Sequence, residues 1–140
     1  MLTSMAAVGA MALTAATPAE ATPAWTNWAT YEATSSNNAS YGTLDYRYES
    51  TGGGWYKADF SYINLNDMRG GDGWGSAIRS HYDTPSGAQW GLLAQVDDFG
   101  GEFRPGETYY NVKNVWFEVC NWNPSSGAMN SCVKMRKKTS

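Results

Sequence analysis

The sequence predicts an all-β domain, an antiparallel β-sandwich of about seven or eight strands. The chain of 140 residues holds 7 Trp, 9 Tyr and 4 Phe, and aromatic and β-branched residues favour strands. Clusters of turn-forming residues, including many of the 15 glycines, recur at short intervals, which is typical of a sandwich or barrel. The chain has no long run of Leu, Glu and Lys of the kind that favours a helical bundle. Its length suits one compact domain.

Strand-like runs alternate with clusters of Gly, Asn, Asp, Ser and Pro along the chain. In one of these runs Leu44, Tyr46 and Tyr48 alternate with polar residues, so one face is apolar and the other solvated. This alternation is typical of antiparallel sheets. Seven segments are therefore expected to form strands: Trp28–Thr34, Tyr41–Ser50, Trp55–Leu65, Ser76–Asp83, Gln89–Asp97, Tyr109–Trp122 and Met129–Met135.

The last two strands are expected to form a hairpin closed by a disulfide between Cys120 and Cys132. These are the only cysteines in the chain, and two cannot by themselves form a structural zinc site. Closing this loop should stabilise the fold by about 3 kcal/mol, whereas two buried thiols are the alternative. The turn residues of 123–127 fit the hairpin tip. The bridge sets four opposing pairs: Val119 with Val133, Phe117 with Met135, Glu118 with Lys134, and Trp116 with Arg136.

The N-terminal segment is expected to be a signal peptide, residues 1–21. Met5–Leu13 is apolar and uncharged, but it is too short to span a bilayer. Ala19-Glu20-Ala21 fits the small-x-small cleavage pattern, with cleavage after Ala24 as the alternative. The β-sandwich domain is then 25–135, followed by a basic tail, 136–140. We expect a secreted protein whose mature chain has no transmembrane segment, while a tail on a cytosolic protein is the alternative.

The apolar leader, the single late disulfide and the run Val115–Cys120 followed by Cys132 resemble the small exported proteins common in actinobacteria. The resemblance covers the leader and the last hairpin and carries no catalytic motif. It implies an extracellular β-domain.

Two glycine-rich turns carry aromatic residues that are candidates for ligand binding. Trp55 and Tyr56 follow three glycines, and Trp74 follows Asp72 within a second turn. A flat ring beside polar groups suits a sugar, because the apolar face of the sugar stacks on the ring while its hydroxyls form hydrogen bonds. A protein partner or simple core packing is the alternative. By contrast, Trp90, Trp116 and Trp122 lie within predicted strands and are expected to pack.

Arg79, His81 and Asp83 are spaced by two in a predicted strand, so all three should project from one face. Such a cluster is the alternative candidate for catalysis, with His81 as acid or base and Arg79 on developing charge. The chain has no second His and no Gly-x-Ser-x-Gly motif. The simpler interpretation is the solvated face of a hairpin strand. We therefore favour no catalytic site.

Asp97, Asp98 and Glu102 surround two glycines and are the alternative candidates for a Ca²⁺ site. Calcium needs six to eight oxygen ligands, and this segment lacks the EF-hand spacing. An ordinary polar turn is the simpler interpretation. We therefore expect no metal and no cofactor.

The distribution of charged residues along the chain argues against one class of partner. The stretch 22–133 holds 12 acidic and 6 basic residues, whereas Lys134, Arg136, Lys137 and Lys138 make the C-terminus basic. An acidic body argues against nucleic acid as a partner. The sequence thus favours a secreted module, not an enzyme, that binds extracellular carbohydrate or cell-envelope glycan through loop aromatics. The alternatives are a small hydrolase of phosphodiesters or glycans using His81, and a protein-binding or inhibitor module presenting loop 121–131.

Overall fold

The computed structural model describes residues 24–97 and 100–139, and within them it is all-β, as the sequence predicts. The predicted signal peptide lies outside the described residues. The eight strands are β1 (Ala29–Thr34), β2 (Ser40–Gly52), β3 (Trp55–Asp67), β4 (Gly75–Thr84), β5 (Gly87–Val96), β6 (Gly101–Trp122), β7 (Met129–Lys134) and β8 (Arg136–Lys137).

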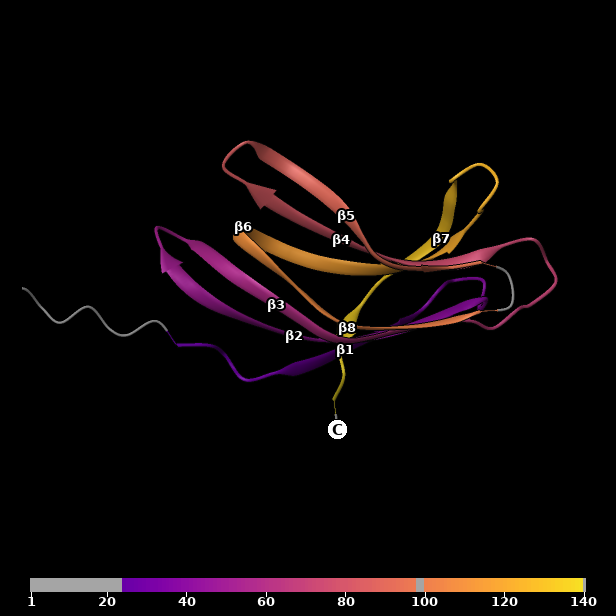
Figure 1. Ribbon diagram of the computed structural model, residues 1–140, viewed down its shortest axis with the longest axis horizontal. Helices are drawn as coiled ribbons and strands as arrows, with labels where there is room; N and C mark the ends of the chain where they lie inside the picture. Colours follow the sequence, from indigo (N-terminus) through magenta and orange to yellow (C-terminus); the bar gives the residue numbers. More distant parts are fainter. Residues whose placement is uncertain (1–23, 98–99, 140) are drawn as a thin grey trace, which may run out of the picture.

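The strands form two layers that share β6. Sheet A has the order β6-β3-β2-β1-β8, sheet B has the order β5-β4-β6-β7, and every pairing is antiparallel. Figure 1 shows β6 bending back on itself at the left of the view, between the β2–β3 and β4–β5 hairpins. At this bend Asn111 and Asn114 have φ of 56° and 52°, a left-handed conformation that Asn tolerates better than most residues. The first half of β6 therefore pairs with β3 and the second half with β4 and β7.

The hydrophobic core lies between the two sheets. Leu44 and Phe60 from sheet A meet Ile78 and Phe117 from sheet B, and all four are buried. The rings of Phe60 and Phe117 pack edge to face with centroids 5.4 Å apart, a favoured geometry for aromatic pairs. Gly42 lets the layers approach closely, because a Cβ there would lie 2.9 Å from side-chain carbons of Ile78 and Val119.

The C-terminal hairpin is confirmed with its disulfide, and its predicted register holds in part. Cys120 and Cys132 are bonded, and Val119 pairs with Val133 and Glu118 with Lys134. The predicted pairing of Trp116 with Arg136 is wrong, because β7 ends at Lys134 and Arg136 pairs with Glu32 of β1. Phe117 keeps one link across the hairpin, accepting a hydrogen bond of 2.8 Å from the Met135 amide. The chain leaves sheet B at this point to become the edge strand of sheet A.

The structure extends most of the predicted strands by one or two residues, and it adds whole strand segments in two places. Residues 101–108 form the first part of β6, although Gly101, Pro105 and Gly106 argue against a strand. Proline is tolerated there because this part of β6 pairs with β3 alone, which leaves its other edge free. The second place is β8, which lies in the segment expected to be a basic tail. The folded domain therefore continues past Met135, and in 24–97 and 100–139 no helix is long and apolar enough to cross a membrane.

Candidate ligand-binding groove

The structure places the four ligand-binding residues predicted from the sequence at two ends of the molecule. Trp55 and Tyr56 begin β3, whereas Asp72 and Trp74 follow its last residue. The 13 residues of β3 span about 40 Å at roughly 3.3 Å per residue. Asp72 closes its own turn, since its Oδ1 accepts a hydrogen bond of 2.8 Å from the Trp74 amide. One short ligand cannot contact both pairs.

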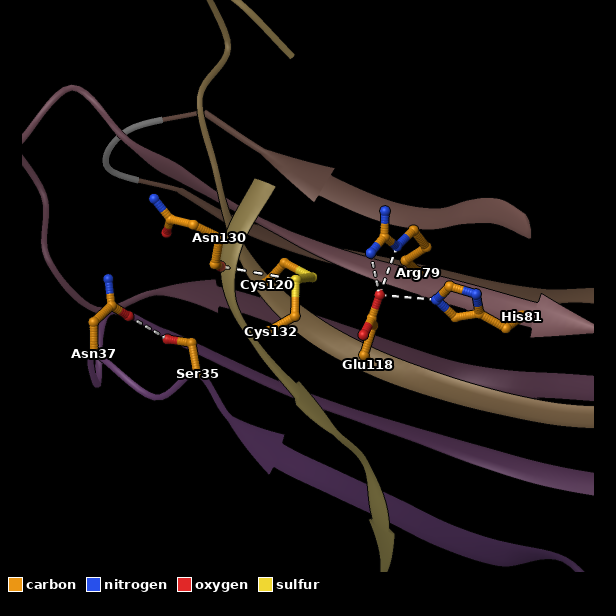
Figure 2. The surroundings of a disulfide bond; sticks show 8 residues. All are labelled: Ser35, Asn37, Arg79, His81, Glu118, Cys120, Asn130 and Cys132. Carbon is orange, nitrogen blue, oxygen red and sulfur yellow. Dashed lines mark hydrogen bonds and ion pairs between the residues drawn. A yellow bond between two sulfur atoms is a disulfide. The ribbon is translucent and has the colours of Figure 1, made fainter. Parts of the chain in front are cut away.

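The predicted cluster on β4 forms around Glu118, a residue that the sequence analysis does not single out as a candidate. Arg79 and His81 share the outer face of sheet B, where both point to Glu118 of β6 (Figure 2). Glu118 Oε1 accepts hydrogen bonds from Arg79 Nε at 2.6 Å and from Arg79 Nη2, and it lies 2.8 Å from His81 Nε2. Asp83 does not join this network; it accepts a hydrogen bond of 2.7 Å from Asn114 Nδ2.

Aromatic rings flank the Glu118 network, and their faces are already in contact with the protein's own cations. Trp116 stacks on His81 with ring centroids 3.8 Å apart, and Lys134 Nζ lies 5.3 Å from the Trp116 ring centre. Arg79 lies 5.5 Å from the centre of the Trp90 ring. Trp90 is 58% exposed, so the expectation that it packs is wrong: its strand ends the sheet, and its side chain projects outward. The network is largely satisfied within the protein.

This arrangement gives His81 a fixed orientation. An ionised Glu118 can only accept hydrogen bonds, so its contact with His81 puts the proton on Nε2. Such a dyad, with Arg79 beside it, is suited to general acid–base chemistry. The three hollows described below are lined neither by His81 nor by Arg79 and Glu118.

The tryptophans near the outer face of sheet A and at the tip of the β2–β3 hairpin are covered in the same way. Arg47 lies with its guanidinium carbon 4.4 Å from the Trp25 ring centre and 4.3 Å from that of Trp28. Lys113 Nζ lies 4.6 Å from the ring centre of Trp55. Cation–π contacts of this kind are worth about 0.5–1 kcal/mol at exposed sites. A ligand that stacks on the same face of one of these rings would have to displace the cation.

The residues considered for Ca²⁺ do not gather into a site in the described part of the chain. Asp98 lies outside the described residues, and Asp97 is exposed. Both oxygens of Glu102 already accept hydrogen bonds, one from Arg104 Nε at 2.6 Å and the other from a backbone amide of β5 at 2.9 Å. Among the described residues the one cluster with metal-ligand spacing is Glu118 with the two cysteines, and the disulfide removes their thiolates as ligands.

A groove lined by tyrosines runs along one open edge of the sandwich, and we call it the tyrosine groove. It comprises three neighbouring hollows of about 270, 230 and 170 Å³. Tyr46 lines all three hollows, and Tyr31 and Tyr48 line two each. The other lining residues that matter here are Tyr56, Asn114, Trp116, Lys134 and Lys137.

The topology explains why this edge is open. Strand β7 pairs with β6 from Trp122 to Glu118 and then crosses to sheet A. On the side of the crossing toward the β6 bend, β7 no longer pairs with β6. Residues 114–116 of β6 there pair with β4 alone or lie in the bend. The inner face of sheet A is therefore only partly covered beside Tyr46 and Tyr48, which alternate inward on β2. Tyr46 is half-buried and packs edge to face against Phe117 of sheet B, whereas Tyr48 is 39% exposed.

The four tyrosine rings form a continuous series. Ring centroids are 5.9 Å apart for Tyr31 and Tyr46, 5.8 Å for Tyr46 and Tyr48, and 5.0 Å for Tyr48 and Tyr56. Burial raises the pKa of the Tyr46 hydroxyl well above its usual value, and the other three tyrosines raise this pKa further. Tyr46 is therefore a neutral hydrogen-bond donor and acceptor at ordinary pH.

The hydroxyls of these four tyrosines are free to bind a ligand. None of them forms a hydrogen bond with any residue in 24–97 or 100–139, whereas the hydroxyls of Tyr41 and Tyr109 bond to Glu32 and Ser80. Burial raises the pKa of Tyr109 to about 12, and its bond to Ser80 opposes that rise. The tyrosine groove thus combines ring surface with unpaired hydroxyls, a combination that the capped tryptophans do not offer.

Sequence reasoning found Tyr56 but missed the rest of the groove. The alternation along β2 predicts that Tyr46 and Tyr48 share the apolar face with Leu44, and this is the side on which they lie. The available signal was chemical: the inward positions change from Leu to Tyr along β2, and buried Tyr hydroxyls usually have a partner. Comparisons with protein-family models, with curated proteins and with solved structures found no match.

Proposed function

We propose that the protein is a binding module for extracellular carbohydrate or cell-envelope glycan and that the glycan occupies the tyrosine groove. One observation carries the proposal: four contacting tyrosines line adjoining hollows, and their hydroxyls have no partner among the described residues. Aromatic surface with unpaired polar groups in a concave site is the usual composition of a small-molecule site.

The chemistry of sugars matches these side chains. A sugar ring has an apolar C–H face, which stacks on an aromatic ring, and hydroxyls on its edge, which need hydrogen-bond partners. Each tyrosine supplies both, and Asn114, whose Nδ2 donates to Asp83, adds an amide oxygen at the end of the groove nearest Tyr56. The groove therefore suits an oligosaccharide better than a purely apolar ligand.

Export is part of the same proposal. The bonded Cys120–Cys132 pair supports an oxidising compartment, because disulfides persist in secreted proteins and are rare in the cytosol. The apolar leader supports a signal peptide. Mass analysis of the protein recovered from the culture medium of a secreting host tests this, and we expect a mature N-terminus at Thr22 or Trp25.

Binding is tested with the purified 140-residue chain and a panel of extracellular glycans, read by intrinsic fluorescence and calorimetry. The panel pairs acidic oligosaccharides with neutral counterparts and includes cellotetraose and chitotetraose. We expect saturable binding of at least one glycan, weakened about tenfold or more by Tyr48→Ala and by Tyr56→Ala, because each removes stacking surface and a hydroxyl worth about 1–2 kcal/mol together.

Two aromatic residues outside the groove, one exposed and one half-buried, provide matched controls. Tyr110 is 69% exposed, and Trp74 lies at the far end of β3. Tyr110→Ala and Trp74→Ala should leave the affinity unchanged within about twofold. Binding that is lost with Trp74→Ala and kept with Tyr48→Ala, or no binding to any member of the panel, would contradict the proposal.

A hydrolase is the second candidate, and the contact of His81 with Glu118 favours it because this contact orients the imidazole. Incubation of the chain with RNA and with the same glycans, across pH, tests this candidate. Turnover that disappears in His81→Ala would support it. Turnover equal to that of a buffer blank would remove it.

A third candidate is a protein-binding module that presents loop 121–131, and the internal bonding of its turn favours it. Asn123 Oδ1 accepts hydrogen bonds from the amides of Ser125 at 2.9 Å and Ser126 at 3.2 Å. The turn is thus held in one shape, and preordered loops bind at a lower entropic cost. Replacing residues 124–127 with an unrelated turn should abolish capture of a protein partner and leave glycan binding intact.

A further inference from the structure

We propose that the glycan bound in the tyrosine groove is acidic and that its carboxylate, phosphate or sulfate group binds Lys134 and Lys137. This inference rests on the proposed function, since it names the chemical class of the ligand for the same groove. It comes from a separate observation, the charge of the groove, and it can fail while glycan binding itself holds.

The groove is positively charged in a protein that is otherwise acidic. The chain has a formal net charge of −3, yet the residues that line the three hollows include two lysines and neither Asp nor Glu. Lys134 lines the 230 Å³ hollow and Lys137 lines the 270 Å³ hollow. Both hollows are also lined by Tyr31 and Tyr46, so the two lysines flank the same stretch of the groove. Lys134 reaches it from the rim, since it pairs with Glu118 and its ammonium lies above the Trp116 ring on the outer face of sheet B.

Neither lysine forms a salt bridge with the residues in 24–97 or 100–139, although Lys134 pairs across the strands with Glu118. In the described part of the chain no carboxylate lies within 4 Å of the ammonium group of Lys134 or Lys137, whereas the neighbouring Lys138 lies 3.6 Å from Glu32. The ammonium of Lys134 lies above the Trp116 ring at 5.3 Å, which leaves its charge available to an anion. A glycan with acidic groups would supply the missing partner.

The fold places these charges at the groove by the same crossing that opens it. Lys134 is the last residue of β7 and Lys137 the last of β8, so the crossing from sheet B to sheet A lies between them. Lys137 pairs with Tyr31 of β1, and residues paired in adjacent strands share a face. Lys137 therefore projects toward the groove, whereas Arg136 pairs with Glu32 and belongs to the opposite face.

The experiment compares acidic glycans with neutral counterparts of the same backbone, using the purified 140-residue chain. The pairs are tetragalacturonate with galactotetraose, a hyaluronan hexasaccharide with its carboxyl-reduced form, a heparin hexasaccharide with its desulfated, carboxyl-reduced form, and a phosphorylated mannose oligosaccharide with its dephosphorylated form. The pair with the largest difference identifies the anion as carboxylate, sulfate or phosphate. Affinity is measured by calorimetry at low and at physiological salt, because screening weakens exposed ion pairs.

The expected result is that an acidic member binds about tenfold or more tightly than its neutral partner. Lys134→Gln and Lys137→Gln should each weaken the acidic member about fivefold, the upper range for an exposed ion pair. Both variants should leave the neutral member within about twofold. Lys138→Gln, which removes the same charge beside the groove residues, is the matched control and should change neither affinity.

Two results would overturn the inference, and they differ from each other. Equal affinity for acidic and neutral members, unchanged by both lysine variants and reduced by Tyr48→Ala, would overturn the acidic ligand and leave the glycan-binding proposal standing. Absence of binding throughout the panel would overturn the proposed function together with the inference.

Discussion

Glu118 organises the outer face of sheet B through a single oxygen atom. Its Oε1 receives both Arg79 and His81, and its side chain is 10% exposed while that of Arg79 is 25% exposed. In this position the Glu118 carboxylate is the hydrogen-bond partner of two side chains, Arg79 and His81, that would otherwise have no such partner in the described part of the chain. Removing one member of a buried charged pair is therefore costly, because its partners stay behind without compensation.

We expect Glu118→Ala to lower the free energy of unfolding by about 2 kcal/mol, a magnitude reduced from that of a fully buried pair because Arg79 is partly exposed. Urea unfolding followed by circular dichroism measures this. Glu107→Ala is the control, since Glu107 is exposed on the same strand. A loss no larger than that of Glu107→Ala would show that the network contributes nothing to stability.

Tyr109 makes stability depend on alkaline pH. Burial raises its pKa to about 12, above the value of about 10 that the unfolded chain has. Between these values the native state keeps a proton that the unfolded state loses, so the stability present below about pH 10 decreases as the pH rises to about 12. Tyr46, whose pKa burial also raises, acts in the same direction.

In Tyr109→Phe this loss should be smaller, because the substituted ring has no proton to release. The free energy of unfolding, measured at about pH 9 and about pH 11.5, gives the loss for each variant. Tyr110→Phe, at an exposed position of the same strand, should keep the wild-type loss. Identical losses in the wild type and Tyr109→Phe would contradict this account.

The strand elements show that the close contact between the two sheets depends on Gly42. A methyl group at this position of β2 would lie 2.9 Å from carbons of both Ile78 and Val119. Overpacking of this kind costs about 1–3 kcal/mol. We therefore expect Gly42→Ala to lower the free energy of unfolding by that amount in urea.

Gly101→Ala is the matched substitution outside the core. Gly101 is exposed, and a Cβ there would meet the flexible side chain of Asn66 at 3.0 Å and a backbone oxygen at 3.7 Å. Its effect should stay below that of Gly42→Ala. Equal effects of the two substitutions on the free energy of unfolding would contradict this prediction. They would indicate that the two sheets can move apart at Gly42 without a loss of stability.

The strands could be predicted from the sequence where alternation or a covalent constraint was strong. The disulfide correctly placed Val119 opposite Val133 and Glu118 opposite Lys134, because a bonded pair fixes the register near it. The register predicted from the disulfide is wrong beyond Lys134, because the chain moves there from sheet B to sheet A. No pattern in the neighbouring residues of the sequence indicates such a change of sheet. The first part of β6 was missed because Pro105 is unusual in a strand and is allowed here by a free edge.

At the scale of the whole molecule, the candidate site depends on which strands cover which face of each sheet. This arrangement cannot be predicted from the residue pattern of a single sequence. Arg79 and His81 were found because a spacing of two puts residues on one face. Glu118 joined them through a pairing 39 residues away in the chain. Tyr31, Tyr46 and Tyr48 look like core residues in the sequence. Tyr31 and Tyr46 do pack against the core, and they also line the groove because β7 crosses to sheet A beside them.

The central claim is that a glycan lies in the tyrosine groove. Its most direct test is an NMR titration of the isotope-labelled chain with the panel glycan of highest affinity. We predict that the largest chemical-shift changes fall on Tyr31, Tyr46, Tyr48, Tyr56 and Lys137, while those of Trp74 and Trp90 stay small. Largest changes at Trp74 and Asp72, or around His81 and Trp90 with the tyrosines unaffected, would contradict the account.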